Sequence, residues 1–461
     1  MNKTLTDRMQ NIVSLCKRRG FAYPGSLIYG GFANSYTYGP YGTELKNNIK
    51  QVWWKTFVQG MPEINGIDGD IILHPKTWEA SGHLQNFNDF LMDCKNCKAR
   101  LRVDQVIKDQ TGEDTEGKPI EEMEKILREK KIKCPICGKS DFTKPRKFNL
   151  MFSTEMAKTG EHSTAYLRPE TAQVMFLEFK NIVDSMRVKL PFGIAQIGKA
   201  FRNEITPGNF IFRRLEFEQM EIEYFIEEKN WKKEFTRWQK LMQDWCLTIG
   251  LSKEHCHEYE HPQEKLSHYS KRTIDIEYDF PFGRKELYGL AYRTDFDLAQ
   301  HEKFSGEVLR IHDEASGQKI QPHVIEPTFG IDRSVLAILS ESYTEEKLED
   351  GTDRIVLKMA PIIAPVKVTV LPLMKKDGLA EKAHEIFDLI KTFGNSEYDE
   401  SGSIGKRYRR QDEIGTPVCV TIDYETLKDN DVTIRDRDTM KQERVKIKDL
   451  VSILKTKYFS A

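Results

Sequence analysis

Arginine, glutamate and phenylalanine residues recur at short intervals in one stretch of the chain. Arg202 and Glu204 belong to an F-R-x-E unit, and Arg213, Phe217 and Glu221 follow at four-residue spacing. On a β-strand, this spacing places side chains on one face of the sheet. Arginine pairs with phosphates through its planar fork, and an aromatic ring stacks on a base. The residue types therefore predict a nucleotide-binding face on a sheet.

A β-hairpin over residues 198–225 is predicted to position these side chains. Its β-rich arms, AFRNEI and FIFRRLEFEQMEIEYF, flank a TPGN segment that suits a turn. The alternative is an amphipathic hairpin whose charged side chains all face water. The ring of Phe217 between Arg213 and Glu221 argues against that alternative, because an exposed face does not need it.

Four cysteines form two C-x-x-C pairs, Cys94 with Cys97 and Cys134 with Cys137. Thiolates at this spacing chelate one tetrahedral zinc ion, and a glycine after the second pair permits a tight turn. A Lys/Glu-rich helical stretch, residues 121–133, separates the pairs. Four thiolates close the coordination shell, so the prediction is a structural zinc site. The alternatives are unconnected reduced thiols, or a redox pair, which has no thioredoxin-like unit beside it.

Carboxylates are also concentrated in residues 273–299, which alternate like paired strands. Such a set can hold Mg²⁺ against phosphates. Earlier in the chain, Glu170 precedes a predicted helix, and two interpretations of it stay open: a site carboxylate, or one that only complements the helix dipole. The charged residues of the 273–299 segment include Asp275, Glu277, Glu286, Arg293, Asp295 and Asp297.

Two further polar clusters give weaker signals. The HCHEYEH cluster at 255–261 lies in a segment, 227–272, that is predicted to be helical. No ligand partner recurs there at metal-binding spacing, so a metal site is not favoured. A basic turn at 405–415, GKRYRRQDEIG, suits contact with an RNA backbone. A solvated charged loop is the alternative for this turn.

The composition describes an ordinary water-soluble chain. Its 461 residues suggest about two to four domains. The formal net charge is −1, so a nucleic-acid partner would be bound by local basic patches. No apolar run is long enough to span a bilayer, and the N-terminal segment reads as a polar helix without a signal-peptide core. We expect a cytoplasmic protein with reduced cysteines and no membrane partner.

Helices and strands are predicted around these motifs. Residues 44–58 form a helix whose apolar stripe suits core packing more than a dimer interface. Residues 321–340 read as a strand, a glycine turn and an apolar helix. A hinge-like segment, 341–360, precedes a small α/β domain at 361–461, where strands and helices alternate. The stripe of the first helix consists of Leu45, Ile49, Val52, Trp53 and Phe57.

Taken together, the motifs resemble those of class II aminoacyl-tRNA synthetases, specifically the homodimeric glycyl-tRNA synthetases, over nearly the whole chain. The helix at 44–58, the following strand and Pro75 resemble motif 1. The 198–225 stretch resembles motif 2, and FGIDR at 329–333 resembles motif 3. The glycyl type is indicated by the strings YGPYGTELKNN, WEASGH, YLRPETAQ, RNEITPG, FEQMEIEYF, RTDFDL and EPTFG.

The resemblance implies an α/β fold with an α+β catalytic domain. A six-stranded antiparallel sheet flanked by helices is expected there, followed by a C-terminal α/β anticodon-binding domain. The expected divisions are a first catalytic part at 1–92, a zinc-binding insertion at 93–147, a second catalytic part at 148–345 with a helical insertion near 227–272, and an anticodon-binding domain at 361–461. Some relatives lack cysteines at the positions of Cys94 and Cys97, so the family's chemistry does not require zinc.

The resemblance also assigns residues to ATP. Arg202, Glu204 and Arg333 are the implied catalytic residues: Arg202 on the α-phosphate and glycine carboxylate, Glu204 toward the adenine amino group, and Arg333 on the base and γ-phosphate. Arg213 would clamp the γ-phosphate, and Phe217 would stack under the adenine. Glu286 is the implied Mg²⁺ ligand. Other positions implied around ATP are Asn203, Phe212, Arg214, Leu215, Glu216, Leu287, Gly330, Ile331 and Asp332.

A glycine pocket needs carboxylates around the ammonium group and bulk where a side chain would otherwise fit. Glu170, Glu326 and Thr328 match the family's glycine-binding positions, and Glu218, Gln219 and Glu221 are expected to line the same wall. A steric clash rejects a larger amino acid more strongly than the about 1–3 kcal/mol lost with one methyl contact. Arg102, Phe217, Met220 and Gly330 complete the implied set.

The implied activity is ligation of glycine to tRNA(Gly) through glycyl-adenylate, with ATP as substrate, Mg²⁺ and structural Zn²⁺ as metals, and a homodimer as the assembly. Two alternatives stay open. One is a catalytically inactive, synthetase-like protein that binds nucleic acid. The other is a class II synthetase for another small amino acid.

Overall fold

A seven-stranded sheet lies at the centre of the computed structural model, which describes residues 3–115, 118–158, 161–204, 208–313 and 317–459. Six strands are antiparallel, as expected, and the seventh, a short edge strand that follows the helix of motif 1, runs parallel to its neighbour. In spatial order the strands are β12 (Cys256–Glu260), β13 (Arg272–Phe280), β14 (Gly283–Thr294), β17 (His323–Gly330), β11 (Glu216–Ile226), β10 (Phe192–Phe201) and β3 (Ile64–Gly66).

Helices cover one face of this sheet and bury the larger core. That face carries the apolar, even-numbered side chains of β11 and β13, such as Ile222 and Ile276. The predicted apolar stripe at 44–58 is part of this core, where Leu45, Ile49 and Trp53 are buried. The covering helices are α1 (Lys3–Arg19), α2 (Pro40–Trp53) with its π-helical continuation η2 (Trp54–Gln59), α9 (Trp231–Thr248) and α11 (Ile331–Ser342).

The opposite face is covered only at one end. A second core packs Phe225 of β11 and Ile194 of β10 against short helices, while the other end of the face stays open for a site. The elements here are β4 (Ile72–Leu73), β8 (Ser153–Lys158), β9 (Glu161–Leu167), α3 (Pro75–Ala80), α4 (His83–Asn86), α7 (Ala172–Leu177), α8 (Phe179–Met186), α10 (Phe296–Ser305), β15 (Ile311–Asp313) and β16 (Gln318–Ile320).

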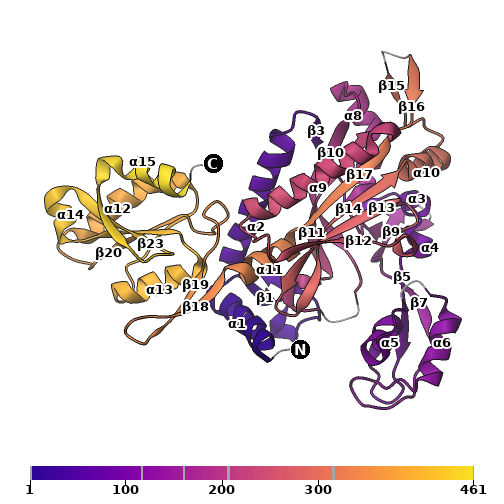
Figure 1. Ribbon diagram of the computed structural model, residues 1–461, viewed down its shortest axis with the longest axis horizontal. Coiled ribbons are helices and arrows are strands. Elements are labelled where there is room, and N and C mark those ends of the chain that lie inside the picture. Colours follow the sequence, from indigo (N-terminus) through magenta and orange to yellow (C-terminus); the bar gives the residue numbers. More distant parts are fainter. Residues whose placement is uncertain (1–2, 116–117, 159–160, 205–207, 314–316, 460–461) are drawn as a thin grey trace.

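Two outer units flank the sheet on opposite sides (Figure 1). The insertion holds the cysteines and consists of β5 (Asn88–Asp93), β6 (Arg100–Arg102), α5 (Val103–Thr111), α6 (Ile120–Glu129) and β7 (Arg146–Asn149). The C-terminal unit is a five-stranded sheet in the order β21-β20-β22-β23-β24, covered by helices. Its elements are β20 (Val368–Pro372), α12 (Leu379–Ile390), β21 (Ser396–Tyr398), α13 (Ile404–Ile414), β22 (Val418–Ile422), α14 (Tyr424–Asp429), β23 (Asp431–Asp436), β24 (Gln442–Lys446) and α15 (Ile447–Tyr458).

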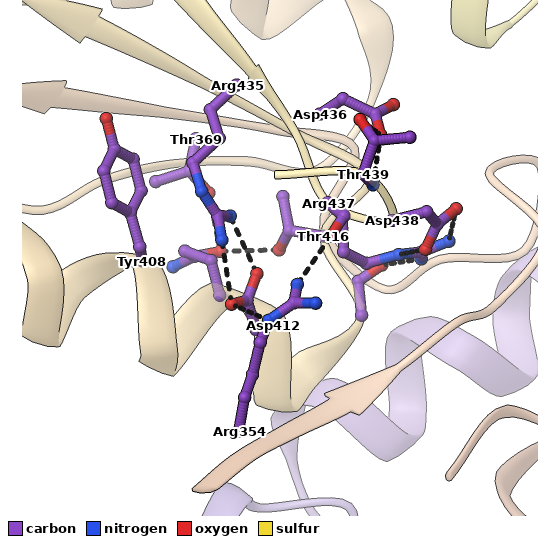
Figure 2. A network of polar contacts seen from close by, with 12 residues as sticks. Arg354, Thr369, Tyr408, Asp412, Thr416, Arg435, Asp436, Arg437, Asp438 and Thr439 are labelled. Atoms are coloured by element: carbon purple, nitrogen blue, oxygen red, sulfur yellow. Dashed lines mark hydrogen bonds and ion pairs between the residues drawn. The ribbon is translucent and has the colours of Figure 1, made fainter. Parts of the chain in front are cut away.

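The segment expected to act as a hinge is a β-hairpin. Its strands are β18 (Tyr343–Lys347) and β19 (Asp353–Leu357). Figure 2 shows that Arg354 of β19 meets Asp412 of α13 in a buried network. Asp412 also accepts hydrogen bonds from Arg435 of β23, at 2.9 and 3.1 Å. The hairpin is therefore anchored to the C-terminal unit by charge-assisted hydrogen bonds.

Three local predictions are wrong. The second arm of the 198–225 hairpin begins at Glu216 and not at 210, because Phe210 and Ile211 pack into the core as part of a 3₁₀ turn, η3 (Phe210–Phe212). Residues 206 and 207 of the expected TPGN turn and residue 205 at the end of the first arm lie outside the described residues. The 227–272 segment is helical only over α9 and then adds the edge strand β12.

The third wrong prediction concerns the basic turn at 405–415, which is the helix α13. Arg407 is buried and donates to the carbonyl oxygens of Pro372, Leu373 and Asp399. This arginine holds the fold together and does not face an RNA backbone.

The remaining short elements connect these layers. They are β1 (Ala22–Pro24), η1 (Leu27–Tyr29), β2 (Tyr36–Tyr38), η4 (Glu228–Asn230), η5 (Gln263–Lys265) and η6 (Lys391–Phe393). Among the helices of the described residues, none is long and apolar enough to cross a membrane.

Candidate active site

One row of polar residues crosses the open face of the central sheet. Strand pairing aligns Gln196 with Glu221, Glu221 with Thr328, Thr328 with Gly289 and Gly289 with Asp275. Directly paired residues point to the same face, so five strands contribute to one surface. Along the strand direction, the charged residues of motifs 2 and 3 lie on one side of this row and a buried carboxylate cluster lies on the other, and we call these two sides the ends of the row.

Arg202 is held between two aromatic rings. Its guanidinium carbon lies 5.3 Å from the ring centroid of Phe87 and 5.2 Å from that of Phe217. Its Nε donates to the carbonyl oxygen of Pro169 at 3.0 Å, which ties it to the segment that carries Glu170. A guanidinium fixed in this way presents its remaining donors to an anion at little further entropic cost.

Arg333, at the first turn of α11, lies across the sheet beside Glu286. Its Nη1 is 3.0 Å from a carboxylate oxygen of Glu286, and its guanidinium lies 4.6 Å from the ring centroid of Phe212. Arg333 is the main cause of the lowered pKa of Glu286. Glu286 keeps about half of its side chain exposed (49%), so this carboxylate stays ionised and reachable. Carboxylate oxygens of this kind are suitable Mg²⁺ ligands.

Glu204 and Arg213 face each other across the loop between β10 and β11. A nitrogen of Arg213 lies 3.6 Å from Oε2 of Glu204, beyond hydrogen-bond length. Within the described ranges, this buried oxygen has no hydrogen-bond partner. An unsatisfied buried acceptor is suited to an incoming N–H group such as an amino group on a base. Nearby, Arg102 is neutralised by Asp89 and Asp104.

Arg214 and Asp332, both expected around ATP, form a buried pair with each other. Their side chains are 9% and 5% exposed. Arg214 also donates to the carbonyl oxygen of Tyr36 at 2.6 Å, and the Tyr38 hydroxyl donates to Asp332 at 2.6 Å. The side chains of Arg214 and Asp332 thus bind other protein groups. They join motif 2 to motif 3 and do not reach toward a nucleotide.

Several other expected residues offer only their main chain to the site. The side chains of Leu287, Ile331 and Met220 lie in the large core on the helix-covered face. Glu216 pairs with Lys199 on that same side of β11. Asn203 and Leu215 lie in the loop between β10 and β11, and Gly330 ends β17. Leu215 has an apolar side chain, Gly330 has none, and the side chain of Asn203 forms no hydrogen bond or ion pair with the described residues.

Glu218 does not line the same wall as Glu221, so that expectation is wrong. Residues an odd number apart on a strand point to opposite faces. Glu218 forms ion pairs with Lys46 (2.7 Å) and Lys50 (3.1 Å) of α2, beside a cavity of about 550 Å³ on the helix-covered side. Gln219, on the same face as Glu221, keeps its expected position.

The carboxylate end of the row is built around Glu221 and Glu170. Glu221 is 2% exposed and accepts hydrogen bonds from the hydroxyls of Thr328, at 2.7 Å, and Thr171. Glu170 lies 3.2 Å from Nε2 of His83 and accepts a hydrogen bond from Gln173 at 3.1 Å. Burial opposes ionisation of Glu170, but His83, Arg293 and Gln173 together outweigh it and the pKa of Glu170 is lowered.

Buried arginines fix this end of the site. Arg168 donates to the carbonyl oxygens of Lys199, Gly69 and Asp70, which sets the course of the segment that leads into Glu170. Gly198 leaves room for the side chain of Arg168, because a Cβ atom at position 198 would lie 2.1 Å from Nη2 of Arg168.

Arg293 binds Glu326 at 2.8 Å and Asp297 in a bidentate pair at 2.8 and 2.9 Å. Burial nevertheless raises the pKa of Glu326 to about 8. The cluster therefore combines a strongly ionised carboxylate, Glu170, with neighbouring glutamates that share one proton near neutral pH.

Sequence reasoning did not assign His83 or Phe87 to the site, and it named Arg293 and Asp297 only within a carboxylate-rich segment that could hold Mg²⁺. His83 lies in the WEASGH string, whose Ser81 hydroxyl is 2.8 Å from its Nδ1. The i, i+4 spacing of Arg293 and Asp297 was a signal for their pairing, although residue 293 lies in a strand and 297 in a helix. Phe87 had no sequence signal.

The four cysteines of the insertion converge on one point. Sγ of Cys94 lies 3.6 Å from Sγ of Cys137, and Cys97 lies 3.6 Å from Cys134. All four sulfur atoms lie within 4.8 Å of one another. Tetrahedral zinc with Zn–S bonds of about 2.3 Å requires sulfur atoms about 3.8 Å apart. The arrangement fits a zinc ion and leaves no coordination position for a substrate.

The fold and the motif geometry are those of a class II aminoacyl-tRNA synthetase. The family model described as "tRNA synthetase class II core domain (G, H, P, S and T)" matches residues 157–342, and the one described as "Anticodon binding domain" matches residues 367–457. The expected fold class, a class II catalytic domain followed by an anticodon-binding domain, is thereby confirmed.

Curated relatives narrow the class further. A glycine–tRNA ligase of Geobacillus thermodenitrificans is 52% identical over 455 residues, which cover 97% of each chain. One from Clostridium acetobutylicum is 53% identical over 456 residues, covering 97% of this chain and 98% of its own. The chain belongs to the glycine–tRNA ligase family.

Proposed function

We propose that this chain activates glycine with ATP and transfers the glycyl group to tRNA(Gly), using the row of residues across the open sheet face. In the first step a glycine carboxylate oxygen attacks the α-phosphorus, and the bond to pyrophosphate breaks. In the second step the terminal ribose hydroxyl of tRNA attacks the carbonyl carbon and releases AMP. Positioning and charge stabilisation dominate in such displacements.

The motif 2 and motif 3 end of the row is assigned to ATP. Arg202 would hold the α-phosphate and stabilise its developing charge, since its guanidinium is already fixed by Phe87 and Phe217. Arg213 and Arg333 would bind the outer phosphates, and the free acceptor of Glu204 would receive the adenine amino group. Mg²⁺ held at Glu286 would neutralise phosphate charge.

The carboxylate end of the row is assigned to glycine. Glu170, Glu221 and Glu326 would surround the ammonium group, and the buried Oε1 of Gln219, unpartnered among the described residues, would accept from it. The methyl group of Thr328, held by its hydroxyl against Glu221, would occupy the space that a side chain needs. The observation that carries the proposal is that Glu170, Glu221 and Glu326 gather over one sheet face, while Arg202 is tied to the segment of Glu170 through the carbonyl oxygen of Pro169.

The proposal extends to assembly, metal and location. A homodimer is proposed from the motif 1 resemblance of α2 and β3. A structural zinc ion in the insertion is proposed from the sulfur geometry. A cytoplasmic location is proposed because tRNA charging serves translation there.

Charging of a tRNA(Gly) transcript with labelled glycine tests the proposal. The protein is expected to form acid-stable glycyl-tRNA in an ATP- and Mg²⁺-dependent manner. Binding of tRNA without any charging would instead favour the catalytically inactive alternative.

A further inference from the structure

A second glutamate on the site face of β11 has no assigned role. Glu223 follows Glu221 by two residues, so both point to the same face. Its side chain is fully buried (0% exposed). Throughout the parts of the chain that the structure describes, neither of its carboxylate oxygens has a hydrogen-bond partner. Buried polar groups without partners are rare in folded proteins and call for an explanation.

Glu223 lies in a cluster of carboxylates. Ligand oxygens of Glu221, Glu223 and Glu326 lie within 4.8 Å of one another. The charged groups that face Glu223 are Glu326 of β17, Arg293 of β14, Glu221 of β11 and Asp297 of α10. One strand away, β10 presents only the apolar side chain of Ile194 at the paired position. Behind Asp297 lie Gln173, His301 and Glu170.

The charges around Glu223 do not balance if every carboxyl group is ionised. Four carboxylates would then face one guanidinium, that of Arg293. A buried carboxylate without a counter-ion takes up a proton instead of remaining charged. Burial, followed by the charge of Glu326, raises the pKa of Glu223 well above its ordinary value.

Geometry decides which glutamate carries the proton. Arg293 contacts Oε1 of Glu326 at 2.8 Å and so favours the anionic form of Glu326. Both oxygens of Glu221 accept hydrogen bonds, from Thr328 and Thr171, which also favours its anion. No group among the described residues donates a hydrogen bond to Glu223. Placing the proton on Glu223 therefore costs less free energy than placing it on Glu221 or Glu326.

We propose that Glu223 is a positioning residue that remains protonated in the active enzyme and donates a hydrogen bond to Glu326. The bond would hold the carboxylate of Glu326 toward the glycine ammonium without adding a further buried charge. The inference rests on the proposed assignment of this end of the row to glycine. A buried carboxylic acid kept neutral so that it can donate is an established catalytic device.

The proposal fixes the sign of a pH effect on stability. A carboxyl group whose folded-state pKa is raised contributes stability that is fully present below its unfolded pKa and is lost as pH rises through the folded pKa. Glu223→Gln removes this titration while keeping the shape and an N–H donor. The melting temperature of the variant relative to wild type should therefore increase as pH is raised from about 6 to about 9.

The experiment compares Glu223→Gln with Glu221→Gln, the same substitution two residues earlier on the same strand face. Pyrophosphate exchange gives KM for glycine, and infrared spectroscopy detects the C=O band of a protonated carboxyl group. We expect Glu221→Gln to raise KM by about 10- to 100-fold, the loss of a charged hydrogen bond. The rise in KM should be at least tenfold smaller for Glu223→Gln than for Glu221→Gln. The protonated-carboxyl band of the wild-type protein should be absent from the infrared spectrum of Glu223→Gln.

Three results would overturn the proposal: equal KM effects of the two variants, no protonated-carboxyl band in wild type near neutral pH, or a metal ion that wild type retains and Glu223→Gln loses. The second result stands even if Glu223→Gln does not fold, since it needs only the wild-type protein. Absence of glycine-dependent exchange by wild type would refute the proposed function instead, and the infrared band would still report on the proton.

Discussion

Arg202 is the residue on which the proposed chemistry depends most. Its donors are aimed by Phe87, Phe217 and the carbonyl oxygen of Pro169, so its position is set before a substrate arrives. Arg202→Ala should lower the rate of glycine-dependent pyrophosphate exchange by about 100- to 1,000-fold, as loss of one preorganised donor to a developing charge does.

The matched control for this prediction is Arg310→Ala. Arg310 is about half exposed (47%) and pairs with Glu302 away from the site. Its removal should change exchange by less than about twofold, because exposed ion pairs contribute little. If Arg202→Ala and Arg310→Ala lose similar amounts of exchange activity, Arg202 does not have the special role proposed for it.

At the scale of elements, the pair of Arg214 and Asp332 joins the motif 2 strand to the helix α11. Asp332 is 5% exposed and also binds Tyr38 and the backbone N–H of Glu218. Arg214→Ala would leave this carboxylate buried without its cation, at a cost of about 3–5 kcal/mol in the free energy of unfolding. Chemical denaturation measures this cost.

Lys199→Ala provides the comparison for the buried pair. Lys199 is paired with Glu216, but both side chains are about half exposed, 52% and 46%. Its loss should cost less than about 1 kcal/mol. If the two variants lose equal stability, the Arg214–Asp332 pair does not join the two motifs as described.

The insertion is expected to depend on zinc for its own fold. Its small core, which includes Met92, Val103 and Ile107, is separate from the cores of the catalytic sheet. Purified protein should contain about one zinc ion per chain. Cys97→Ser should lose the ion and speed amide hydrogen exchange in α5 and β5, while exchange in β10 and β11 is unchanged.

Cys256→Ser is the cysteine control, because Cys256 lies in β12, outside the cluster. It should retain the zinc ion. A metal-free wild-type protein with a protected insertion would contradict the zinc assignment.

Sequence patterns predicted some elements much better than others. The alternation of β13 and β14 and the apolar stripe of α2 were recognisable because burial imposes periods of two and 3.6 residues. The face of Glu218 was also predictable, since it differs in parity from Glu221, but the resemblance placed both on one wall.

Other features had no usable local signal. The 210–215 segment is as β-prone as β11, and only tertiary packing of Phe210 and Ile211 makes it a loop. In α13, Arg407 and Gln411 are buried four residues apart, yet they are polar and so escaped the hydrophobic pattern. Glu170 meets His83, and Glu326 meets Arg293, only through the tertiary fold, which one sequence does not display.

At the scale of the whole molecule, the network around Asp412 connects the catalytic unit to the C-terminal unit. Arg354, on the linking hairpin, is fully buried and donates to Asp412 at 2.9 Å and to the carbonyl oxygen of Arg437 (Figure 2). Asp412→Asn should loosen this junction. We expect the rate of tRNA charging to fall about tenfold, which is an ordinary size for the coupling between two sites of one protein. Pyrophosphate exchange, which does not need tRNA, should change little.

Asp388→Asn is the control for the junction. Asp388 pairs with Lys391 on the exposed surface of α12. Charging and exchange should both stay near the wild-type values. Parallel losses of charging and exchange in Asp412→Asn would show that the network affects the catalytic unit itself and not its connection to the tRNA-binding unit.

The central claim is that the row from Arg202 to Glu326 activates glycine. It is tested most directly by ATP–pyrophosphate exchange with the wild-type protein and each of the twenty amino acids, without tRNA. The carboxylates around the ammonium group and the methyl group of Thr328 predict exchange with glycine and little with alanine or serine. Exchange supported by alanine or serine but not by glycine would contradict the assignment of the site.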